Sequence, residues 1–176
     1  MTEYTQRGST LVISLIILII LMLLGVTAMV TSNTAFKLAG NLQFENNAMN
    51  SAEAVLSEVE NWLEAGTIDY NHVDFFAPPP VTTSTTGRYP RNSGVDPMNM
   101  TWNDTNSAAA GQGRYIIELM STNNVLIGSS VTVGGPLSYA CNRVNTYRIT
   151  ARGASARGAA KLVQSYFSIL MTSTTC

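Results

Sequence analysis

The chain has 176 residues, and its 10 lysines and arginines against 11 aspartates and glutamates give a net charge of -1. Charged residues make up only 12% of the sequence, about half the usual share in soluble domains. The near-zero charge argues against a basic surface for nucleic acid, and one histidine with two cysteines leaves too few ligands for a Cys/His metal centre or a histidine-based catalytic site. We therefore expect no cofactor, no metal and no nucleic-acid partner. The length allows one domain with an appendage.

An uncharged span of 29 residues lies between Arg7 and Lys37, and residues 11–30 within it are almost entirely apolar. A helix of twenty residues is about 30 Å long, which matches the hydrocarbon core of a bilayer. The alternatives are a buried helix of a soluble core and a secretory signal cleaved near Ala28. The apolar run is longer than a signal core and continues into more helical sequence, so we predict that it inserts into the membrane.

The helical pattern continues beyond the apolar span. Steps of four and three connect eight positions, seven of them apolar: Leu38, Leu42, Glu45, Met49, Ala52, Leu56, Val59 and Leu63. The opposite side, predicted to face solvent, carries Glu53, Glu58, Glu60 and Glu64. Gly66 is a natural C-terminal stop. The spacing predicts one helix from about Thr10 to Glu64, on the order of 80 Å long, with two helices joined near Gly40 as the alternative.

Residues 66–113 are poor in signals for regular structure. A run of three prolines blocks both helix and central strand, and residues 82–107 contain thirteen Ser, Thr or Asn among twenty-six. Loops of this length are usually functional or disordered. Tyr89, Met98 and Trp102 are expected to anchor this one as a folded-back loop, and an adhesive role would reside in it.

Four oxygen-bearing side chains lie close together in this loop: Asp96, Asn99, Asn103 and Asp104. Oxygen ligands of this kind could in principle hold Ca²⁺. Their spacing matches no known calcium loop, so ordinary turn chemistry is the expected role.

The last third of the chain is predicted to form strands, at residues 114–120, 125–133, 146–152 and 161–171. Tyr147, Ile149 and Ala151 alternate with more polar residues, which indicates one buried face. The short connection at residues 153–158 predicts that the last two strands form a hairpin. An antiparallel sheet covered by the amphipathic helix would give an α+β domain.

Two cysteines remain, Cys141 and Cys176. If the domain of this membrane-anchored chain lies outside the cytoplasm, oxidising conditions would allow them to form a disulfide. The chain-entropy model assigns a loop of this length about 4 kcal/mol. Separate free thiols are the alternative.

The order of these features resembles a type IV pilin, and more narrowly the PilX-type minor pilins of Gram-negative bacteria. The segments that carry the resemblance are Arg7–Gly8, Leu23–Val26, Ala39–Asn41, Ala52–Ala54 and Tyr147–Gly153. The likeness covers about residues 6–64 and 146–170. It implies a type IV pilin-like α+β fold, in which a long N-terminal helix, with a transmembrane half and an amphipathic half, packs on a small antiparallel sheet.

The resemblance also implies a division of the chain. Its parts are a leader peptide at 1–8, a transmembrane and filament-core helix at 9–36, an amphipathic helix at 37–65, a loop region at 66–113, and a sheet with the C-terminal disulfide region at 114–176. Prepilin peptidase would cut between Gly8 and Ser9, and the new amino group of Ser9 would be a candidate for methylation. Pilins more often carry Phe or Met at this position, so Ser9 is a departure.

A second departure is Ile13. Major pilins resemble one another in having a glutamate at this position. A carboxylate inside the bilayer is costly and needs a partner, in pilins thought to be the terminal amine of the adjacent subunit. A subunit without this requirement suits the start of assembly. The resemblance thus implies a minor pilin that primes the pilus or joins its tip complex and supports pilus biogenesis, twitching motility and adhesion.

The implied partners are other minor pilins, the major pilin, prepilin peptidase and the inner-membrane assembly platform. The chain would span the inner membrane once, with its C-terminal domain in the periplasm, before it reaches the pilus or cell surface. A minor pseudopilin of a type II secretion system is the alternative, since it would share the anchor and the helix. We expect no enzyme, because the sequence has no nucleophile elbow, phosphate loop or metal spacing.

Overall fold

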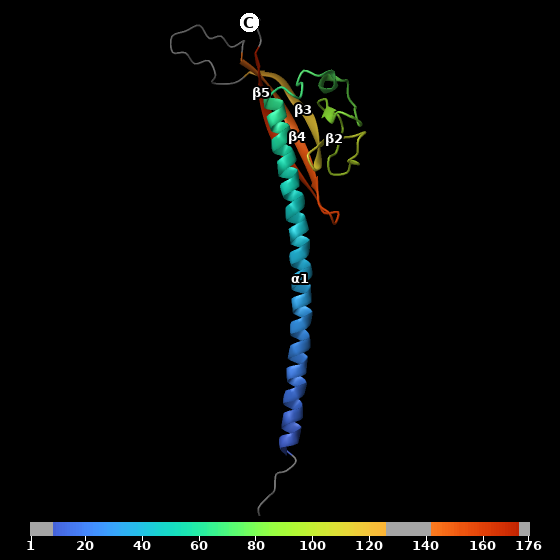
Figure 1. Cartoon of the computed structure of the whole chain (residues 1–176). Coiled ribbons are helices and arrows are strands. Elements are labelled where there is room, and N and C mark those ends of the chain that lie inside the picture. The colour runs from blue at the N-terminus through green and yellow to red at the C-terminus, as the bar shows by residue number, and fades with distance from the viewer. Residues whose placement is uncertain (1–8, 126–141, 173–176) are drawn as a thin grey trace, which may run out of the picture. The chain divides into compact units, whose positions relative to one another are not determined.

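The computed structural model describes residues 9–125 and 142–172. The chain divides into two compact units, Met1–Gln43 and Phe44–Cys176. Helix α1 (Ser9–Glu64) supplies the described part of the first unit and continues into the second (Figure 1). The other elements belong to the second unit, here called the globular unit: η1 (Val73–Phe76), β1 (Arg88–Tyr89), β2 (Ala108–Ala110), β3 (Gly113–Val125), β4 (Asn142–Ala154) and β5 (Ala160–Thr172).

Helix α1 is continuous over 56 residues, as the spacing predicts. It passes through both Gly25 and Gly40, so the alternative of two helices joined near Gly40 is wrong. The helix ends at Glu64, and Gly66 follows with a φ of 71°. Glycine adopts this left-handed conformation at low cost, which confirms its predicted role as the stop.

The sheet has the strand order β1-β3-β4-β5, and β2 pairs with β3 on the same edge as β1. The three long strands are antiparallel, and β4 and β5 pair continuously from Asn142 and Thr172 to Ala154 and Ala160. This confirms the predicted hairpin. The short strand β1 runs parallel to β3, so the sheet is mixed rather than purely antiparallel. The strand predicted at 125–133 lies almost wholly outside the described residues.

The buried face of β4 is the predicted one. Tyr147, Ile149 and Ala151 are fully buried and belong to the same core cluster as Val55 and Val59 of α1. In the globular unit, α1 therefore packs across one face of the sheet (Figure 1). The opposite face is partly covered too, because residues 90–95 of the loop region lie beside β3 and β4 there.

The side of α1 that enters the core confirms the second half of the predicted stripe but not the first half. The buried positions are Ala48, Ala52, Val55, Val59 and Leu63. Three of these, Ala52, Val59 and Leu63, belong to the predicted stripe. Three other apolar members of the stripe are exposed: Leu38, Leu42 and Met49. Small residues occupy the first two buried positions because Gly153 of β4 approaches the helix backbone there.

The loop region carries more structure than its composition suggests, since η1, β1 and β2 all lie within it. Tyr89 is fully buried and its hydroxyl donates to the Asn106 carbonyl at 2.7 Å, which confirms it as an anchor. The indole of Trp102 is half-buried and donates to the Pro97 carbonyl at 3.1 Å. Met98 is 77% exposed, so its predicted anchoring role is wrong.

Three buried tyrosines give the globular unit a specific sensitivity to alkali. Burial raises the pKa of Tyr89, Tyr115 and Tyr147 above the ordinary value of 10.0. Because the unfolded chain ionises these phenols near pH 10 while the folded chain keeps them protonated, stability is complete below that pH and falls as pH rises above it.

We expect alkaline unfolding to coincide with late ionisation of these three phenols, as followed by phenolate absorbance and circular dichroism on the same sample. Replacing the exposed Tyr166 by phenylalanine should leave the unfolding midpoint unchanged. Complete titration of every tyrosine near pH 10 with the fold intact would contradict the prediction.

Candidate functional site

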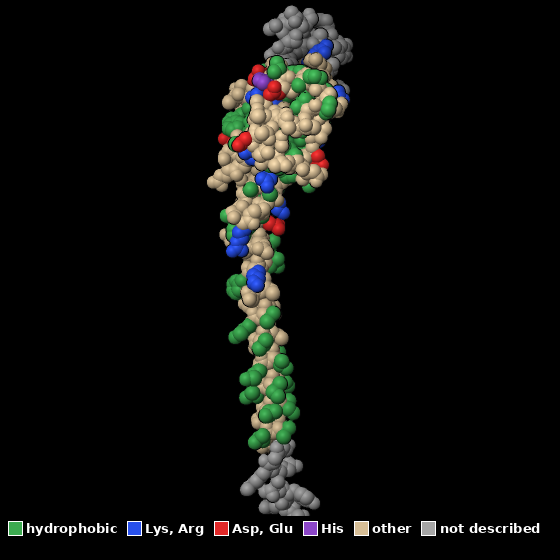
Figure 2. Space-filling view, turned by 90° about the vertical axis from the view of Figure 1, so that its right-hand side faces the viewer, with side chains coloured by type: hydrophobic (Ala, Val, Ile, Leu, Met, Phe, Trp, Pro, Cys, Tyr) green, Lys and Arg blue, Asp and Glu red, His purple; other side chains and the backbone are tan. Residues whose placement is uncertain are grey.

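The first candidate surface is the apolar part of α1. Every large apolar side chain from Leu11 to Val30 is exposed, between 47% for Ile19 and 76% for Met29. Figure 2 shows these hydrophobic side chains along the helix. The most apolar window has a mean hydropathy of 3.1, and by length and composition this helix can cross a membrane. Such a surface requires lipid or neighbouring apolar helices around it.

The few hydroxyl groups in this segment are satisfied by the helix itself. Ser14 donates to the Leu11 carbonyl and Thr27 to the Leu24 carbonyl, both at 2.9 Å. Thr31 makes the same kind of bond to its own helix. Because a polar group without a partner is costly in hydrocarbon, these local bonds suit an apolar surrounding.

The predicted processing and charge sites lie near the start of this surface. Gly8 is outside the described residues, and Ser9 is the first residue of α1. Ile13 is 54% exposed, one turn further along the helix, and no charged side chain precedes Lys37 in the described part of α1. An exposed apolar side chain therefore stands at the position where the resemblance to pilins implies a missing glutamate.

Cys141 and Cys176 both lie outside the described residues, so their disulfide stays a prediction. Alkylation of the unreduced protein followed by mass spectrometry distinguishes a bonded pair from two free thiols.

Between them, the four oxygen-bearing loop side chains make turn-forming hydrogen bonds and one ion pair. The carboxylate of Asp96 accepts the side-chain amide of Asn99 at 2.5 Å and a backbone amide, and these bonds lower its pKa. Asn103 caps the next turn, and Asp104 pairs with Arg114 at 2.7 Å. Over residues 9–125 and 142–172, no cluster of three His, Cys, Asp or Glu side chains could hold a metal ion. The expected turn chemistry therefore accounts for this sequence.

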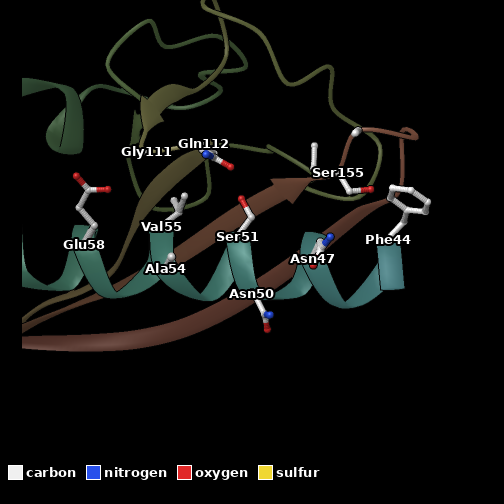
Figure 3. Close-up of a pocket in the computed structure, with 12 residues that line it drawn as sticks. Phe44, Asn47, Asn50, Ser51, Ala54, Val55, Glu58, Gly111, Gln112 and Ser155 are labelled. Atoms are coloured by element: carbon white, nitrogen blue, oxygen red, sulfur yellow. The ribbon is translucent and has the colours of Figure 1, made fainter. Parts of the chain in front are cut away.

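A second candidate site, which the sequence did not reveal, is a hollow of about 580 Å³ beside α1, lined by both polar and apolar residues. Figure 3 shows Asn47 and Ser51 on the helix, with Gln112 and Ser155 on neighbouring turns. The hydroxyls of Ser51 and Ser155 are buried and have no partner among the described residues. Glu58 is the one ionisable residue in its lining, so the hollow offers hydrogen bonds without the paired groups that acid–base catalysis needs.

Two family models match the chain. The model described as PilX N-terminal matches residues 7–57, and the model described as type IV pilus assembly protein PilX C-term matches residues 33–169. The chain belongs to the PilX family. The second match alone covers more than half of this PilX-family pilin, including the helix–sheet core. Neither the curated proteins nor the solved structures give a match.

Membership of this family indicates the role of the exposed apolar helix. PilX-family proteins are minor pilins that take part in type IV pilus assembly with other pilins and membrane components, and they are structural proteins rather than enzymes. The apolar part of α1 is the membrane-anchoring segment of this PilX pilin. The sequence identifies it directly, whereas the hollow beside α1 depends on contacts between distant segments.

Proposed function

We propose that this PilX-family pilin primes type IV pilus assembly and sits in or near the tip complex. The observation that supports this role is the apolar, exposed side chain of Ile13. A subunit with a carboxylate there needs the amine of an earlier subunit, because an unpaired charge in an apolar surrounding is unfavourable. Ile13 makes no such demand, so this chain can take a place where no earlier subunit is present.

The proposal includes a route to that place. Prepilin peptidase removes residues 1–8, and the amino group of Ser9 is the candidate for methylation. The apolar segment of α1 holds the chain in the inner membrane with the globular unit in the periplasm. The assembly platform then transfers the helix into a filament, where helices of other minor pilins and the major pilin replace the lipid. Twitching motility and adhesion depend on the resulting pilus.

The test is to locate the chain in sheared filaments. We expect immunogold label on an epitope-tagged chain at filament ends, while label on the major pilin follows the shaft. In the same preparation, mass spectrometry should find a mature chain that begins at Ser9. Deletion of the gene should reduce the number of pili rather than their thickness.

Label spread evenly along the shaft would overturn the tip position, although the chain would remain a pilin. A chain that begins at Met1, or after Ala28, would overturn the processing route. Absence from surface filaments together with a defect in protein secretion would favour the type II pseudopilin instead.

A further inference from the structure

A hollow of about 670 Å³ opens in the loop region between η1 and β1. Its lining carries hydroxyl groups of four residues together with one carboxylate and one guanidinium: Thr83, Ser84, Thr85, Thr105, Asp74 and Arg88. Ligand sites usually have volumes between about 300 and 1,000 Å³ and a small number of placed polar groups. Ala77 and Val81 complete the lining, so the hollow has the size of a ligand site and offers both polar groups and an apolar wall.

Arg88 is the unusual member of this lining. Its Nε is buried and has no hydrogen-bond partner among the described residues. None of the ion pairs among these residues involves the Arg88 side chain. Of the four arginines on β3 and β4, two make ion pairs among the described residues. Arg114 contacts Asp104 and Ser107, and Arg148 contacts Glu118 at 2.7 Å. The terminal Nη atoms of Arg88 also make no hydrogen bond or ion pair with the described residues, so this side chain retains the capacity to pair with an anion that enters the hollow.

The backbone holds Arg88 firmly in place. It lies in β1, where it pairs with Ile117 of β3. Its own amide donates to the Ser84 hydroxyl at 3.2 Å, and the Gly87 amide donates to the Ser84 carbonyl at 3.1 Å. A charged group on a strand that is bonded to the central sheet is better positioned for binding than one on a free loop.

The carboxylate of Asp74 does not neutralise Arg88. Its Oδ2 accepts the Thr86 hydroxyl at 2.7 Å and lies 3.3 Å from Nδ1 of His72. Its Oδ1 makes no hydrogen bond to the described residues and can accept one from a ligand hydroxyl. Thr83 and Thr85 are exposed, and neither hydroxyl is engaged within the described part of the chain.

We propose that this hollow binds an acidic saccharide. The sugar carboxylate pairs with the Arg88 guanidinium, and ring hydroxyls bond to Asp74, Thr83 and Thr85. One cation beside one anion suits a ligand that carries many hydroxyls and an isolated carboxylate. Nucleic acids and anionic lipid surfaces are bound by several cations together, which this lining lacks. Binding is a property of the single chain, so the inference goes beyond the proposed function and does not rest on the filament position.

The test uses the full-length chain in detergent micelles and an oligogalacturonate as the probe, with binding measured by calorimetry. Carboxyl-reduced oligogalacturonate and an oligoglutamate peptide of equal charge separate the contributions of the carboxylate and the hydroxyls. We expect the oligogalacturonate to bind the native chain. Its affinity for the Arg88→Gln variant should be lower by about tenfold or more, since a charge-assisted bond is removed. Arg91→Gln removes the same charge from an exposed residue outside this hollow and should bind as the native chain does.

A second variant, Thr83→Val with Thr85→Val, conserves side-chain volume and removes two unengaged hydroxyls. It should keep the native unfolding midpoint and weaken binding of the oligogalacturonate. Equal affinity of Arg88→Gln and Arg91→Gln, or no binding of the probe to the native chain, would overturn the site. Binding of oligoglutamate as tightly as oligogalacturonate would overturn its assignment to a saccharide.

Discussion

Replacing Gly153 by alanine is expected to destabilise the globular unit by about 3 kcal/mol. A Cβ atom added at this position would lie 2.1 Å from the Ala48 carbonyl oxygen and 2.4 Å from the Ala52 amide nitrogen. Both atoms belong to the backbone of α1, so no side-chain rotation relieves the overlap. The helix must move off β4, and the core between Val55 and the sheet must open with it.

The measurement is urea unfolding of the detergent-solubilised chain, followed by tryptophan fluorescence. Both tryptophans, Trp62 and Trp102, belong to the globular unit, so the signal reports on that unit. Gly40→Ala is the matched control, because a Cβ atom there meets nothing within 4 Å and alanine favours helix by about 1 kcal/mol. A Gly153→Ala chain as stable as this control would contradict the close packing of α1 on β4.

This contact also explains what the sequence could and could not predict about the helix. The length of α1 and its stop after Glu64 follow from local signals, namely unbroken helical periodicity and Gly66. The buried side depends on a tertiary contact with Gly153, which lies about a hundred residues later in the chain. Ala52 belongs to the predicted stripe, whereas Ala48 does not, because large apolar residues dominate a periodicity count and this contact requires small ones.

The strands also differ in whether the sequence could predict them. The β4–β5 hairpin was predictable, because alternation around Ile149 and a short connection are local features. Strands β1 and β2 have two and three residues, and only pairing with β3 defines them. The hollow around Arg88 follows from that pairing, since no sequence spacing connects Asp74 with Thr105. The apolar anchor follows from composition alone, whereas the interest of Ile13 follows from the resemblance to pilins.

The second large effect is expected from a charge in the middle of the apolar segment. Ile20→Arg should leave the chain in the membrane but remove it from the filament. Leu, Ile and Val supply fourteen of the twenty residues at 11–30, and together they favour insertion by about 4–8 kcal/mol. One arginine near the centre costs about 2.5–3.5 kcal/mol, so insertion survives.

Packing in a filament does not let the arginine reach a polar environment as a bilayer does. In a bilayer its long side chain can reach toward the headgroups, and lipid and water adjust around it. Between apolar helices the charge would stay buried without a partner. Ile20 is 50% exposed, so the substitution acts on contacts with neighbouring subunits more than on contacts within this chain.

The measurement compares the amount of each variant in isolated membranes with its amount in sheared pili, with Ile20→Leu as the matched control. We expect equal membrane levels and a loss of about tenfold or more from the pili, since a cost above 1.4 kcal/mol changes an equilibrium by at least that factor. Incorporation of Ile20→Arg at the level of Ile20→Leu would mean that this segment anchors the chain without entering a helical core. Because membrane level and pilus level are measured separately, the experiment assigns the apolar helix either to anchoring alone or to both anchoring and assembly.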